Sequence, residues 1–114
     1  LMPGAPEWDR AAVIVNAMAL ARGHHARQPS TGAGLQAIGL SEPRLMALLT
    51  AEFEELRDLL PRIARRAAAS AQPMDWAPLA RLAWHAGRDP ARADRQRQRI
   101  AGDHARAAAA RAAA

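Results

Sequence analysis

The chain has 114 residues and a mass of 12.2 kDa, which suffices for one small domain. Its formal net charge is +5, and all 16 of its Lys and Arg residues are arginine. The absence of cysteine excludes a disulfide scaffold, thiolate catalysis and a cysteine-ligated zinc site. No apolar run is long enough for a membrane helix, and no secretion signal is recognisable. We therefore expect a soluble cytoplasmic protein without membrane contact.

Helical patterns dominate the N-terminal part of the chain. A first helix is predicted from Asp9, its N-cap, to Ala21, with Gly23 ending it. The polar residues at 27–32 then predict a flexible loop, and residues 35–40 a short helical turn. No segment alternates β-branched residues as a strand would.

Two helices are predicted in the middle of the chain. Ser41 and Pro43 are typical of an N-cap and first turn, and they open a helix that runs through Leu49. The next helix, at 52–71, has apolar residues spaced 3, 4 and 3 apart along one face. Pro61 lies inside this pattern and predicts a kink or a break near residue 60.

The C-terminal part predicts two further helices. Asp75 caps the first, with Pro78 in its first turn and Gly87 as a left-handed C-terminal cap. Asp89 and Pro90 open the second as N-cap and first helical residue. We therefore predict an all-α protein, a small antiparallel helical bundle without a β-sheet. The expected divisions are a flexible N-terminus at 1–7, one helical domain at 8–104, and an Ala-rich helical tail at 105–114.

Catalytic and metal-binding patterns are missing from the sequence. His24 and His25 are adjacent and so lie on different faces of a helix, while His85 and His104 are isolated. No serine lies in a nucleophile motif, and the glycines at 32–34 follow no strand and precede no phosphate-binding lysine. We therefore expect no catalytic residues, no metal site and no cofactor.

Arginine carries the clearest functional signal. On the last predicted helix four arginines recur at spacings of 3, 4 and 7, while Arg97 points away from them. This stripe consists of Arg92, Arg95, Arg99 and Arg106. A second group is Arg62, Arg65 and Arg66, and a third is Arg10, Arg22 and Arg27. Guanidinium groups suit phosphate contacts, but the same spacing is compatible with a solvated helix face or an acidic protein partner.

The three tryptophans are candidates for base stacking. Trp76 and Trp84 lie on one predicted helix with leucines between them, which favours a place in the hydrophobic core. For Trp8 both interpretations stay open. Backbone binding without sequence choice fits this chain better than a sequence-reading helix-turn-helix.

Several motifs resemble the CasB family, the small subunits of type I-E CRISPR interference complexes (Cascade). The C-terminal motif consists of Pro73-Met74-Asp75-Trp76, Leu79-Ala80-Arg81-Leu82 and Trp84. The upstream motif is Leu40-Ser41-Glu42-Pro43-Arg44, followed by Leu45-Met46-Ala47-Leu48-Leu49. The resemblance spans most of residues 8–104. The chain departs from the family in being shorter at its N-terminal side and in carrying Pro61 within a helix that is usually uninterrupted.

The resemblance implies an all-helical, non-enzymatic subunit that contacts the backbone and large subunits of the complex, in more than one copy. It implies contacts with guide RNA and target DNA, which support their hybrid and the displaced strand. The candidate nucleic-acid-binding residues are Arg10, Arg44, Arg62, Arg65, Arg66, Arg95, Arg97 and Arg99. Arg44, Arg95 and Arg97 match basic positions of the family, whereas the other five are candidates because they cluster.

Three other functions are compatible with the sequence. A stand-alone helical DNA-binding protein or regulator would bind duplex DNA as a dimer with some sequence preference. A helical adaptor would use its arginines on an acidic protein and would ignore nucleic acid at low salt. An enzyme is the least supported, because no catalytic constellation is present.

Overall fold

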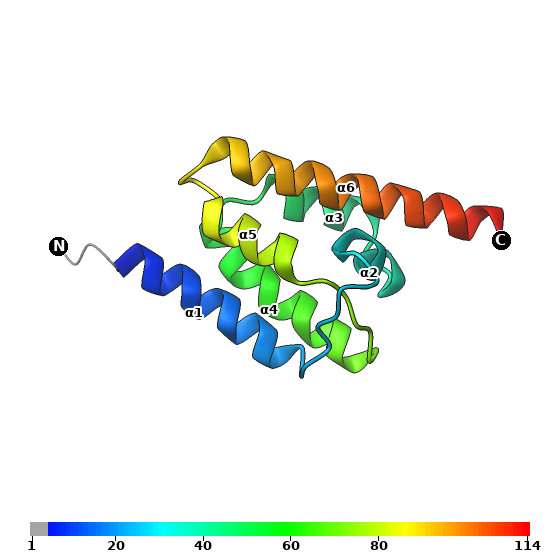
Figure 1. Ribbon diagram of the computed structural model, residues 1–114, viewed down its shortest axis with the longest axis horizontal. Coiled ribbons are helices and arrows are strands. Elements are labelled where there is room, and N and C mark those ends of the chain that lie inside the picture. Colours follow the sequence, from blue (N-terminus) through cyan, green and yellow to red (C-terminus); the bar gives the residue numbers. More distant parts are fainter. Residues whose placement is uncertain (1–4) are drawn as a thin grey trace.

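The computed structural model describes residues 5–114, with side chains from Glu7 onward, and shows six helices along this part of the chain (Figure 1). They are α1 (Ala5–Leu20), α2 (Thr31–Ala37), α3 (Glu42–Thr50), α4 (Phe53–Ala69), α5 (Ala77–His85) and α6 (Pro90–Ala113). Within these residues the only β-type pairing is an isolated bridge between His25 and Met74. The predicted all-α bundle is confirmed. None of the described helices is both long and apolar enough to cross a membrane.

The helices pack around one hydrophobic core. The long helix α6 packs mainly against α2 and α5, while α1 packs against α4 and α5 (Figure 1). The largest fully buried side chains include Trp76, Leu35, Leu48, Leu56, Leu60, Leu79, Leu82 and Ile100. Several alanines are buried among these larger side chains, so a chain poor in large apolar residues still closes a core.

Glycine at position 32 sets the distance between α2 and α6. A Cβ atom there would overlap the backbone of α6 at Ile100 and His104, so no larger residue fits without movement. The structure also shortens the loop predicted at 27–32, because α2 already begins at Thr31. Ser30 caps this helix by accepting a hydrogen bond from the backbone N–H of Ala33 at 3.3 Å.

Two other local predictions are wrong. The first helix begins at Ala5, so Asp9 lies within α1 and does not cap it. Helix α4 runs unbroken through Pro61, so the predicted break does not occur, and the alternative of a kink stays a prediction. Proline removes only one helix donor, and burial of Leu60 and Ile63 on either side of it holds the chain helical.

The predictions for helix boundaries near proline and glycine are confirmed elsewhere. Pro43 lies in the first turn of α3, after Ser41 in the N-cap position. Asp89 caps α6 by accepting from the N–H of Arg92 at 3.2 Å, and Pro90 is the first residue of that helix. Gly87 has φ +79°, the left-handed conformation expected after α5.

The segment before α5 joins it to the loop between α1 and α2. Trp76 occupies the N-cap position of α5, and Asp75, one residue earlier, accepts a hydrogen bond at its Oδ1 from the N–H of Ala77 at 2.9 Å. Trp76 is buried, and its indole Nε1 donates to the carbonyl oxygen of His24 at 3.2 Å. The core interpretation of Trp76 is confirmed, and this motif holds the fold together.

Candidate nucleic-acid interface

A groove between α3 and α4 brings together three of the eight candidate arginines. We call it the α3–α4 groove, with a volume of about 330 Å³. Its lining consists of Leu40, Arg44, Ala47, Leu48, Leu59, Arg62, Ile63 and Arg66. Arg44 comes from α3, while Arg62 and Arg66 lie one helical turn apart on α4. The lining includes no carboxylate, so every charged side chain in it is positive.

The arginines of the α3–α4 groove have few protein partners. All three are exposed, and none forms an ion pair with a carboxylate among the described residues. Arg66 donates one long hydrogen bond, 3.4 Å from its Nη2 to the carbonyl oxygen of Gly39. Three neighbouring positive charges repel one another, and an anionic ligand in the groove would relieve this repulsion. The groove is thus suited to binding an anion.

Arg65 is separated from Arg62 and Arg66 by the folding of α4. It lines a different hollow, together with Arg22 and the small residues where α1 ends against α4. The sequence cluster at 62–66 therefore divides between two surfaces, because successive helical residues are about 100° apart around the axis.

The arginine stripe of α6 lies opposite the buried face of that helix. The buried face carries Ala93, Ile100 and His104, and all four arginines of the stripe are exposed. At the ends of the stripe, Arg92 pairs with Asp89 at 3.3 Å and Arg106 pairs with Asp103 at 2.5 Å.

The two central arginines of that stripe differ from the outer two. Arg95 and Arg99 have no carboxylate within ion-pair distance among the described residues. They lie one turn apart, about 6 Å along the helix axis. With Arg111, they are the exposed arginines of α6 that form no ion pair among the described residues.

Arg97 faces another part of the protein. It pairs with Asp94 at 2.7 Å, and only 24% of its side chain is exposed. It lines a hollow that also includes Glu52 and Glu54 at the start of α4. These carboxylates make its surroundings less favourable for a phosphate than those of Arg95 and Arg99.

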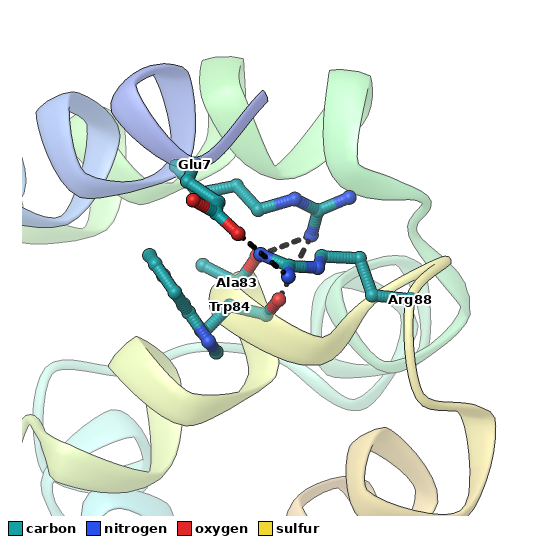
Figure 2. Close-up of polar contacts among 5 residues, drawn as sticks. Glu7, Ala83, Trp84 and Arg88 are labelled. Carbon is teal, nitrogen blue, oxygen red and sulfur yellow. Dashed lines mark hydrogen bonds and ion pairs between the residues drawn. The ribbon is translucent and has the colours of Figure 1, made fainter. Parts of the chain in front are cut away.

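Arg10 is buried and bonded to the end of α5. Its Nη1 donates to the carbonyl oxygens of Ala83 at 2.8 Å and Trp84 at 3.2 Å (Figure 2). The guanidinium group also lies over the ring of Phe53, 4.4 Å from its centre. Burial, and then the nearby charge of Arg88, lower the pKa of Arg10 below its ordinary value. We therefore leave Arg10 out of the interface proposed below.

The histidines have ordinary structural contacts. His25 Nδ1 accepts from the backbone N–H of Trp76 at 3.2 Å, and His104 Nε2 lies 3.1 Å from the carbonyl oxygen of Leu40. Among the described residues, no group of three or more histidine and acidic side chains is arranged to hold a metal ion. The three tryptophans differ in exposure: Trp76 is buried, Trp84 is half-buried under Arg88, and Trp8 is exposed.

The apolar floor of the α3–α4 groove was not identified from sequence. Ala47 lies three residues after Arg44 on α3, and Leu59 lies three residues before Arg62 on α4. Each half of the groove is thus visible as one face of an amphipathic helix. That the two faces meet follows only from tertiary packing.

Comparison with protein families decides the identity of the chain. The family model of the CRISPR-associated protein Cse2 matches residues 2–104. The chain belongs to the Cse2 family. Comparison with curated proteins and with solved structures gave no match. The predicted resemblance to CasB is confirmed, since Cse2 and CasB denote the same family of small subunits.

Membership of the Cse2 family explains the absence of catalytic motifs in the sequence. Cse2 proteins are structural small subunits of the type I-E CRISPR complex Cascade. Family membership therefore implies the other Cascade subunits and the CRISPR RNA as partners of this chain.

Proposed function

We propose that this Cse2-family chain stabilises the guide RNA–target DNA hybrid and the displaced strand through arginine contacts to their phosphates, without catalysis. The observation that carries the proposal is the α3–α4 groove, where Arg44, Arg62 and Arg66 meet without a carboxylate. Arg95 and Arg99 on α6 form a second contact surface. Arg65 contributes a further basic position near the end of α1.

The chemistry of these residues fits backbone contact. A guanidinium group stays charged at physiological pH and donates two parallel hydrogen bonds to phosphate oxygens. Phosphate contacts position a nucleic acid without reading its sequence. In an RNA-guided complex base pairing with the guide supplies sequence recognition, so the small subunit needs no base-reading residues of its own.

The proposal includes the assembly in which the chain works. We infer that it contacts the backbone and large subunits of the complex, is present in more than one copy, and works in the cytoplasm. Co-expression with genomic neighbours and a guide RNA, followed by a gentle pull-down, tests this directly. Recovery of a large particle with RNA is expected. Recovery of the chain alone, together with binding to duplex DNA, would instead favour a stand-alone DNA-binding protein.

The role of the groove is tested by charge neutralisation in the assembled complex. The variant Arg44→Gln/Arg62→Gln/Arg66→Gln should lose target DNA at lower salt than the wild type, while assembling normally. A matched control is Arg27→Gln/Arg81→Gln/Arg111→Gln, which removes three exposed arginines outside the groove. Equal losses in both variants would show that only net charge matters. No loss in the groove variant would exclude the groove as a contact surface.

A further inference from the structure

We propose that the α3–α4 groove binds single-stranded nucleic acid and holds an unpaired base against its apolar floor. Arg44, Arg62 and Arg66 would bind the phosphates on either side of that base. The inference rests on the proposed function and specifies it, because it assigns this groove to an unpaired strand. The arginine stripe of α6 is assigned to backbone contact.

The floor of the groove is the first observation. Between the arginines the groove is lined by Leu40, Ala47, Leu48, Leu59 and Ile63, all of them apolar. Most of this floor belongs to the core, but Ala47 is exposed and Leu59 is half-buried. Covering such an apolar surface with a ligand removes it from water, which favours binding.

The placement of charge is the second observation. Arg44 stands on the α3 wall, and Arg62 and Arg66 stand on the α4 wall, so positive charges flank the floor on both sides. A nucleic-acid strand has the matching order, with a phosphate on each side of every base. The volume of about 330 Å³ is at the lower end of small-ligand pockets, which suits one base and its flanking groups.

A paired hybrid can contact the arginines of the groove but not its apolar floor. Its bases are stacked and paired inside the helix, so it offers phosphates to the rim and leaves the floor in contact with water. An unpaired strand can turn a base toward the floor, and a guanidinium group can also stack on that base. The groove is therefore expected to prefer an unpaired strand that carries bases.

The test compares two single strands of equal charge, and a paired hybrid, with the full chain at low salt. The probes are a short oligothymidylate, an abasic oligonucleotide of the same length, and an RNA–DNA hybrid. Wild type should bind oligothymidylate about fivefold more tightly than the abasic strand. The variant Ala47→Trp fills the groove but keeps its arginines. It should lower the oligothymidylate affinity to the abasic level and leave the hybrid affinity unchanged.

A matched control and the contrary outcomes separate this inference from the proposed function. Ala110→Trp adds the same side chain at an exposed alanine outside the groove and should behave as wild type. Equal affinity for the two single strands, with both weakened in the triple arginine variant, would overturn the base site and keep the phosphate contacts. Unchanged affinity of the triple variant for all probes, or no binding at all, would overturn both. Tighter binding of a polyglutamate peptide would assign the groove to an acidic protein partner.

Discussion

The guanidinium group of Arg10 donates a hydrogen bond to the carbonyl oxygen of Ala83 across 2.8 Å, which joins α1 to the last turn of α5. The last carbonyl groups of a helix have no partner within the helix, and a cation at this end also interacts favourably with the helix dipole. Beside this contact Glu7 pairs with Arg88 at 3.1 Å (Figure 2). An arginine near the N-terminal end of the chain is thus part of the core.

Replacing Arg10 should destabilise the fold. Arg10→Gln leaves the carbonyl groups of Ala83 and Trp84 without their donor and removes the contact with Phe53. The expected loss is about 1–3 kcal/mol in the free energy of unfolding, measured by urea denaturation. Arg95→Gln, at an exposed position without an ion pair, should change it by less than about 0.5 kcal/mol. Unchanged stability of the Arg10 variant with weakened DNA binding would return Arg10 to the interface.

A methyl group at position 32 should separate α2 from α6. In Gly32→Ala the new Cβ overlaps the α6 backbone, which cannot move aside as a side chain can, so we expect a loss of about 1–3 kcal/mol. Gly102→Ala is the control, because its Cβ would meet only the mobile end of Arg106, and it should stabilise the helix by up to about 1 kcal/mol. Thermal denaturation of both variants measures the difference. Equal stability of the two variants would contradict the close approach of these helices.

Replacing the buried Trp76 should destabilise the fold more than replacing the half-buried Trp84. Trp76→Phe removes the indole hydrogen bond to the carbonyl oxygen of His24, which keeps only the N–H of Met74, and leaves a smaller ring in the core, with an expected loss of about 1–3 kcal/mol. Trp84→Phe removes no hydrogen bond and keeps a ring for Arg88, so the expected loss is below about 1 kcal/mol. Chemical denaturation followed by circular dichroism checks both. The reverse order would show that the motif does not stabilise the start of α5.

The two pairs of arginines on α6 should contribute unequally to nucleic-acid binding. Arg95→Gln/Arg99→Gln removes two cations that have no carboxylate partner, whereas Arg92→Gln/Arg106→Gln removes two that are already paired. The first variant should reduce the slope of log K against log salt for an RNA–DNA hybrid by about 2. The second should change it by less than half as much. Titrations at several salt concentrations measure both, and identical slopes would show that the aspartates do not neutralise their neighbours.

Much of the fold was predictable because its signals are local. Pro43, Gly87 and Asp89–Pro90 mark helix ends through backbone geometry, and the structure places helix boundaries at each of them. The predictions of an N-cap at Asp9 and of a break at Pro61 were wrong because packing outweighed local preference. Burial of Val13 and Ala17 along α1 and of Leu60 and Ile63 along α4 keeps both segments helical.

The candidate site was predictable only as a set of arginines. Spacing along α6 indicated the stripe, but not that aspartates pair with its outer members, since those side chains adopt one of several rotamers. The sequence alone also placed Arg10 with the other clustered arginines, because nothing local distinguishes a buried cation from an exposed one. Its burial depends on α5, more than 70 residues further along the chain.

Sequence by itself determined the helical class, the excess of positive charge and the family of this protein, because these follow from composition, periodicity and short motifs. Tertiary structure alone decided which arginines face solvent, which cap a helix, and which share a groove with an apolar floor. The physical reason is that charge is a property of each residue, whereas burial and electrostatic neighbourhood arise only when distant helices pack. The α3–α4 groove forms only when one face of α3 packs beside one face of α4.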